Sequence, residues 1–174
     1  AFIALEINFD AEVLEISDID DEVQWQSASY SSVIKAAMRE RFPSMTKRSE
    51  KKLIYRLVSS GADYQVAQYL RENRDQLGKT VTLWLPADDD IDSYVKGYID
   101  TELPEDARRV SDAQIALVSD LEEGGELDVR FNYIFFNSGD SREPEQAGIK
   151  GAVIGSFLTL LVTLSFSFPL AVAA

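Results

Sequence analysis

The chain contains no cysteine and no histidine. Without cysteine there is no disulfide, no thiolate metal ligand and no cysteine nucleophile. Without histidine, the Ser-His-Asp triad, the imidazole zinc site and the imidazole general base are excluded as well. Most hydrolase and metalloenzyme functions are therefore disfavoured.

Basic residues are scarce relative to acidic ones. The 174 residues, ordinarily the length of one domain, include 17 Lys and Arg against 30 Asp and Glu, a formal net charge of −13. Phosphate groups repel such a chain, so neither nucleic acid nor an anionic membrane surface is expected as its main partner.

Charge is absent from the C-terminal part of the chain. No residue from Gly151 to Ala174 is charged, and most are apolar. A helix that crosses a bilayer needs about 20 predominantly apolar residues, so this stretch is long enough. We predict a transmembrane helix here, with a buried helix of a soluble core as the alternative. A secretory signal is excluded, because it would lie at the N-terminus.

The two ends of the chain lead us to expect that it is a fragment of a longer membrane protein. The chain begins without methionine and stops inside the apolar run with no polar flank. We therefore expect residues 1–146 to form a soluble domain between two spans, and residues 147–174 to form the first part of a transmembrane core. Arg142 and Lys150 are the basic residues near the span, and acidic residues surround Arg142. Because cytoplasmic flanks tend to be rich in Lys and Arg, this pattern favours the outer face of the membrane.

Apolar periodicity predicts a small α+β domain. Alternation with a period of two predicts strands over residues 3–9, 81–85 and 127–136. Helical spacing predicts helices over residues 30–42, 49–60, 63–77, 91–99 and 112–123, and residues 12–22 are expected to form a surface loop.

Local signals predict where these helices begin and end. Gly61 is expected in the left-handed position after the second helix, and Asp63 as the N-cap of the third. Asp89 or Asp90 is expected to cap the fourth helix. Ser111 and Gln114 fit a capping box at the start of the fifth.

The carboxylate run from Asp88 to Asp92 invites a calcium hypothesis. The run lacks the glycine and the glutamate of a calcium loop, since Ser93 and Ile99 occupy those positions. Carboxylates at a helix N-terminus, where they meet the helix dipole, are the favoured interpretation. Other carboxylate pairs carry no weight among 30 acidic residues, and no metal or cofactor site is predicted.

The basic residues and the two tryptophans are expected to have structural roles. Positive charge is concentrated in Lys47, Arg48, Lys51, Lys52 and Arg56. This group is expected to be a solvated helix face, with binding of an anion or lipid head group as the alternative. Trp25 and Trp84 are expected to pack in the core, with lining of a pocket as the alternative. The soluble part thus predicts no active site.

The apolar run has features of a helix packed among other helices. Gly151 and Gly155 match the small-xxx-small pattern that permits close helix approach. Ser156, Thr159 and Thr163 can bond across helices or to the main chain, and Pro169 would free a carbonyl and bend the helix. A single-pass anchor needs none of these residues, so they favour a bundle of several spans.

Residues 138–174 resemble the start of the permease core in the PstA-type subunit of the bacterial phosphate ABC importer. The matching stretches are Ser138 to Glu145, Ala147 to Gly151, Gly155 and Ser156, Thr159 to Leu164, and Pro169 to Ala174. The earlier part resembles the large extra domain that some members carry between the first span and this core. That match is carried by Tyr55, Leu57, Ser59 to Ala62, Val95 to Gly97, and Asp100. Lys150 and Ala171 depart from the family pattern.

The resemblance implies transport without catalysis in this chain. It implies a PstC-like partner permease, a cytoplasmic ATPase and an extracytoplasmic phosphate-binding protein as partners, in the bacterial inner membrane. The soluble domain would lie on the periplasmic side and dock the binding protein or brace the partner permease. Its charge of −13 disfavours phosphate binding by the domain itself.

Two functions of other classes stay open. One is a single-pass membrane-anchored sensor or adaptor, which would have no further spans. The other is an acidic extracytoplasmic enzyme, which would require two carboxylates converging in one pocket.

Overall fold

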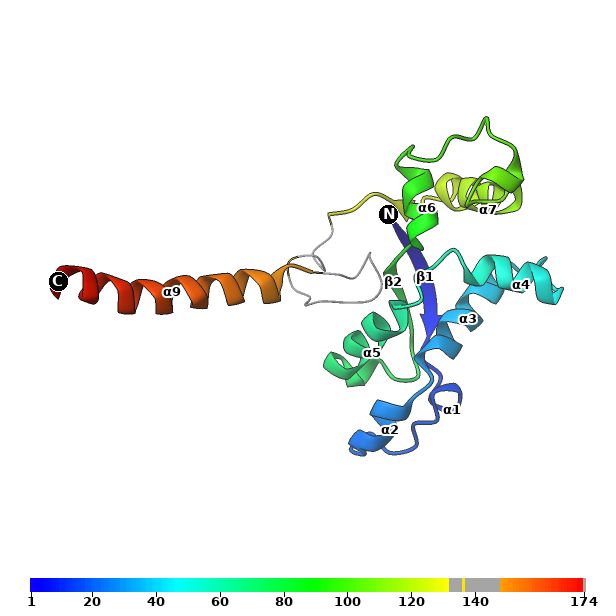
Figure 1. The fold of residues 1–174 in the computed structure, drawn as a ribbon. Coiled ribbons are helices and arrows are strands. Elements are labelled where there is room, and N and C mark those ends of the chain that lie inside the picture. Colours follow the sequence, from blue (N-terminus) through cyan, green and yellow to red (C-terminus); the bar gives the residue numbers. More distant parts are fainter. Residues whose placement is uncertain (132–135, 137–147, 174) are drawn as a thin grey trace. The chain divides into compact units, whose positions relative to one another are not determined.

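A computed structural model describes residues 1–131, 136 and 148–173, with Leu170 and Ala173 described by their main chain alone. The chain divides into an N-terminal unit, Ala1–Arg130, and a C-terminal unit, Phe131–Ala174. The helices and strands of both units are labelled in Figure 1. The predicted domain boundary after residue 146 lies outside the described residues. The prediction of an α+β domain followed by one apolar helix is confirmed.

The N-terminal unit is built on a three-stranded antiparallel sheet with the order β2-β1-β3. The strands are β1 (Phe2–Asn8), β2 (Thr80–Pro86) and β3 (Leu127–Asp128). Ile3, Leu5 and Ile7 of β1 are buried, whereas the residues between them are partly or fully exposed. This alternation puts one face of the sheet in the core and leaves the other open to solvent.

The third strand is much shorter than its sequence predicts. In the register of β1 and β3, Phe2 lies opposite Asp128 and Ile3 lies opposite Leu127. Because β1 begins at Phe2, residues after Asp128 have no strand to pair with in the described part of the chain. Val129 and Phe131 are accordingly 57% and 62% exposed. The predicted strand is wrong for residues 129–131, and residues 132–135 lie outside the description.

Helices occupy most of the chain between the strands. They are α1 (Ala11–Leu14), α2 (Glu22–Ser27), α3 (Tyr30–Arg41), α4 (Arg48–Tyr55), α5 (Ala62–Glu72), α6 (Asp89–Val95) and α7 (Asp112–Glu123), with 3₁₀ turns η1 (Arg74–Gln76) and η2 (Glu105–Ala107). Helix α3 packs against β1, α4 and α5. The five predicted helices are present, and their apolar faces join the buried face of the sheet in one core.

Helix α1 forms at the start of the predicted surface loop, residues 12–22, and a second short helix, α2, begins where that loop ends. Asp10 and Asp21 cap α1 and α2 by accepting the main-chain N–H groups of Glu12 and Val23, each at 2.9 Å. Trp25 is fully buried and donates its indole N–H to the carbonyl of Ile19 at 3.0 Å. Helices of this length are not stable alone, so burial rather than periodicity forms them.

Several predicted helix ends are also wrong. Helix α4 ends at Tyr55 instead of Ser60, because Val58 leaves the helix to bridge Ala87 beside β2. Gly61 has a φ of −93° and is itself the N-cap of α5, so it is neither left-handed nor a C-terminal signal, and Asp63 is not the cap.

The predicted N-cap is wrong for α6 and confirmed for α7. Asp88, not Asp89 or Asp90, caps α6, which ends at Val95 instead of Ile99. The left-handed Gly97, with a φ of +76°, turns the chain away after it. The capping box of Ser111 and Gln114 at α7 is confirmed.

Candidate functional site

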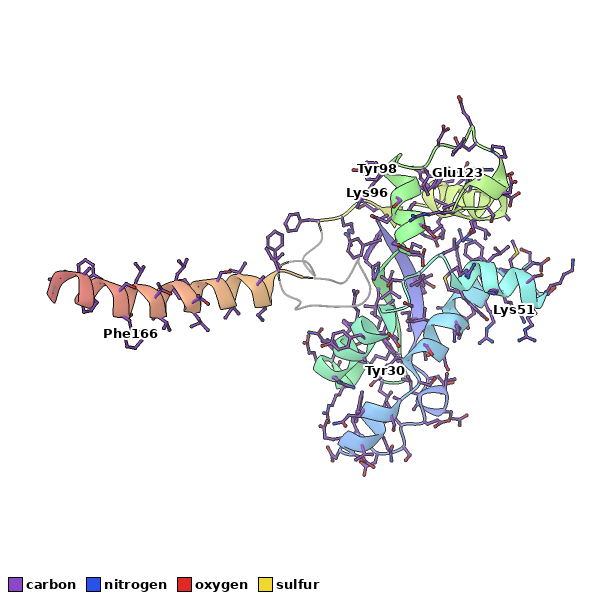
Figure 2. All side chains as sticks on the ribbon, viewed as in Figure 1. Tyr30, Lys51, Lys96, Tyr98, Glu123 and Phe166 are labelled. Carbon is purple, nitrogen blue, oxygen red and sulfur yellow. The ribbon has the colours of Figure 1, made fainter. Side chains whose placement is uncertain are left out.

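The C-terminal unit contains α9 (Lys150–Ala173), and its residues Lys150–Pro169 are long and apolar enough to cross a membrane. Every side chain from Lys150 to Pro169 is exposed, including the large Phe166 (Figure 2). A core helix of a soluble protein would bury an apolar face, and none of this stretch is buried. The membrane helix is therefore favoured over the buried core helix.

Small residues form a stripe along α9, at every fourth position. The stripe consists of Gly151, Gly155, Thr159 and Thr163, and Ser156 lies next to it. A methyl group built on either glycine would meet nothing within 4 Å. Glycine costs a helix about 1 kcal/mol relative to alanine, and the described contacts give no reason for it here. Small residues at this spacing let another helix approach closely in a bilayer.

The threonines of the stripe bond within their own helix. Thr159 donates its hydroxyl to the carbonyl of Gly155, and Thr163 donates to that of Thr159, both at 2.8 Å. The sequence left two possibilities open, hydrogen bonds across helices and hydrogen bonds to the main chain. Both threonines make the bond to the main chain. A satisfied hydroxyl can face lipid or a packed helix without an unpaired donor.

Pro169 lies inside α9. Proline has no N–H, so the carbonyl of Ser165, four residues earlier, receives no main-chain bond from it. In a bilayer such a carbonyl needs a partner from a neighbouring helix, a hydroxyl or a water. The proline thus adds a second feature that suits a helix packed among others.

The acidic turn at α6 has a structural explanation. Asp88 caps the helix by accepting the N–H of Asp90 at 3.2 Å, and Asp90 lies 3.6 Å from a guanidinium nitrogen of Arg109. The three carboxylates of Asp88, Asp89 and Asp90 approach within 4.8 Å of one another. Their place at a helix N-terminus accounts for them, and no calcium loop is formed by these described residues.

The basic group lies at and after the start of α4. Lys47, Arg48, Lys52 and Arg56 are exposed, and Lys51 is partly exposed (Figure 2). Glu50 accepts the N–H of Lys47 at 2.9 Å, and this main-chain bond is the main reason that the pKa of Glu50 lies below its usual value. The arrangement is the expected solvated helix face with a carboxylate at its N-terminus.

A small hollow of about 240 Å³ lies between α3 and the start of α5. Its floor is apolar, with Ile34, Met38 and Val58, and its rim carries Lys35 and Asp63. Pockets for small ligands usually span about 300–1,000 Å³. The hollow is below that range and contains a single carboxylate, so it offers no pair for acid–base catalysis.

A second groove, of about 230 Å³, follows β1 where β3 ends. Its polar lining consists of Glu6, Glu40, Arg41 and Glu126. Arg41 binds Glu126 at 2.5 Å and Asp120 of α7 at 2.9 Å. Glu6 lies on the open face of the sheet, whereas Glu40 belongs to α3, which covers the buried face. Three carboxylates therefore line this groove: Glu126 is held by Arg41, whereas Glu6 and Glu40 are exposed.

The two tryptophans differ in their environment. Trp25 packs in the core, as expected. Trp84 is half-buried on the open face of the sheet, and the guanidinium of Arg130 lies 4.1 Å from the centre of its ring. Neither tryptophan lines the hollow beside α3 or the groove along β1.

Comparison with known families gives one match. The family described as "Domain of unknown function (DUF3333)" matches residues 1–105, from β1 through α6. No curated protein and no solved structure matches the chain. The match leaves α7, β3 and α9 outside the family region.

Proposed function

We propose that this chain, which belongs to the DUF3333 family, is part of the permease subunit of a bacterial phosphate ABC importer of the PstA type. The observation that carries the proposal is the small-residue stripe of α9. Its glycines have open space around them and no role in the described fold, which suits a helix that packs against further transmembrane helices. The resemblance of residues 138–174 to the start of a permease core supports the same function.

In this proposal the chain itself carries no catalysis and needs no cofactor. A PstC-like permease completes the path for phosphate, a cytoplasmic ATPase supplies the free energy, and an extracytoplasmic binding protein delivers the ion. The N-terminal unit lies on the periplasmic side of the inner membrane. There it docks the binding protein or braces the partner permease.

Purification of the complete protein from its native membrane tests the assembly. We expect a second permease and an ATPase to copurify with it in mild detergent, and the reconstituted complex to take up phosphate when ATP is present. The physical reason is that the small-residue stripe of α9 permits another transmembrane helix to pack closely against it. Sulfate in place of phosphate is the control substrate. Recovery of the protein without any ATPase or second permease would contradict the proposal.

The side of the membrane is tested by a single cysteine at Asp89, which is exposed in the first turn of α6. The chain has no cysteine of its own. We expect Asp89→Cys to react with a membrane-impermeant maleimide in intact spheroplasts, because the N-terminal unit faces the periplasm. Gly155→Cys, inside the span, is the matched control and should stay unlabelled. Labelling of Asp89→Cys only after lysis would place the unit in the cytoplasm and contradict docking of the binding protein.

The second candidate function is a single-pass membrane-anchored sensor or adaptor. It is favoured by one observation, that the described residues contain a single helix able to span a membrane. The copurification experiment separates the two functions, because an adaptor would not bring a second permease and an ATPase with it.

A further inference from the structure

Strand β1 has an open edge along its second half. Strand β3 pairs only with Phe2 and Ile3, and the ladder is extended once, where Ala4 donates its N–H to the carbonyl of Glu126 at 2.7 Å. Glu126 directly follows the end of α7 and its two glycines, so no earlier residue continues the ladder. No described strand pairs with this edge from Leu5 to Asn8.

The direction of the main-chain groups along this edge follows from the bonds that are made. Alternate residues of a strand direct their N–H and C=O groups to alternate neighbours. Since the N–H of Ala4 points to the β3 side, those of Glu6 and Asn8 do too. On the other side, Phe9 exchanges bonds with Gly78 and Lys79 next to β2. The main chains of Glu6 and Asn8 thus present two donors and two acceptors to solvent.

The groove of about 230 Å³ runs along the same edge. Ala37 and Glu40 of α3 form its inner wall, and Glu126 closes the end next to β3. Arg41 is already neutralised by Glu126 and Asp120. Glu6 and Glu40 are exposed and have no ion pair among the described residues. One unpaired carboxylate therefore lies on each side of the open edge.

We propose that this edge binds an extended, basic segment of a partner protein, which adds to the sheet as a fourth strand beside β1. Main-chain bonds to Glu6 and Asn8 would hold the segment. Consecutive residues of a strand point to opposite faces. A pair of neighbouring Lys or Arg residues would therefore meet Glu6 on the open face and Glu40 on the helix side.

Charge selects this occupant over a second copy of the chain. Each copy carries −13, and pairing two copies edge to edge would bring Glu6 and Glu40 of one against acidic groups of the other. Like charges directly opposite one another destabilise a strand pair. Phosphate import is not required for this binding, since the open edge and its charges are sufficient for it.

Titration with a fluorescent, end-capped peptide, Thr-Val-Lys-Arg-Val-Thr, tests the site on the whole chain in detergent micelles. We expect saturable binding that weakens with added salt, and slower hydrogen exchange at the amides of Glu6 and Asn8. Glu6→Gln with Glu40→Gln should weaken binding at least tenfold. Both residues are exposed, so the fold should tolerate these changes. Glu102→Gln, at an exposed position away from the groove, should leave the affinity unchanged.

Two control peptides separate strand addition from plain charge attraction. A version with Glu-Glu in place of Lys-Arg should not bind. A version N-methylated on the residues facing β1 keeps its charge but loses its donors, and should bind at least tenfold more weakly. Equal binding of the N-methylated peptide, or unchanged exchange at Glu6 and Asn8, would overturn the proposal. Self-association of the chain that protects the same two amides would overturn it in favour of a second copy.

Discussion

Trp25→Ala is expected to lower the free energy of unfolding of the N-terminal unit by about 3–5 kcal/mol, the usual cost of removing a large buried aromatic side chain. The ring is fully buried, and its N–H bond to the carbonyl of Ile19 fastens the turn between α1 and α2. The guanidinium of Arg74 also lies 5.0 Å from the ring centre. Since small domains are stable by only about 5–15 kcal/mol, this one change would remove a large share of the total.

Urea denaturation followed by circular dichroism, on the whole chain in a mild detergent, measures this effect. Trp84→Ala is the matched control, because Trp84 is half-buried and its ring meets Arg130 on the open face of the sheet. We expect the control to cost about 1–2 kcal/mol, from partial loss of burial and of an exposed cation–π contact. Equal losses for the two variants would contradict the full burial of Trp25.

If α9 packs in the proposed permease, Gly155→Ile is expected to weaken its assembly with a second transmembrane helix at least tenfold, while the thermal midpoint of the N-terminal unit stays the same. The larger side chain meets nothing within the described chain, because space around Gly155 is open. It would block the close approach that a small-xxx-small stripe permits. A tenfold loss corresponds to about 1.4 kcal/mol of association free energy. Copurification of the proposed partner permease from the membrane measures it.

Two variants isolate the effect of the stripe. Gly155→Ala keeps a small side chain and should keep assembly. Val153→Ile adds bulk two positions earlier, on nearly the opposite side of the helix, and should also have little effect. If Gly155→Ile and Val153→Ile weakened assembly equally, or if neither did, the stripe would not be a packing surface.

Local patterns sufficed for the elements whose signals lie within a few residues of one another. The strand alternation of Ile3, Leu5 and Ile7 and the capping box at Ser111 each depend on neighbours along the chain. The same holds for the apolar run that forms α9, since length and composition decide whether a helix can span a bilayer. For the candidate site, the sequence alone indicated Gly151 and Gly155, because residues four positions apart lie on the same face of an α-helix.

Tertiary structure decided everything that depends on distant partners. Helix α4 ends early because Val58 pairs with Ala87, and β3 stops at Asp128 because β1 begins at Phe2. The open edge of β1 could not be predicted, since it exists only because β3 begins at Leu127, shortly after the end of α7. Trp25 is buried because α2 turns it into the core, where it meets Ile19 and Arg74, whereas Trp84 lies on the open face of the sheet. Strand pairing and burial join residues far apart in sequence, and no local propensity encodes them.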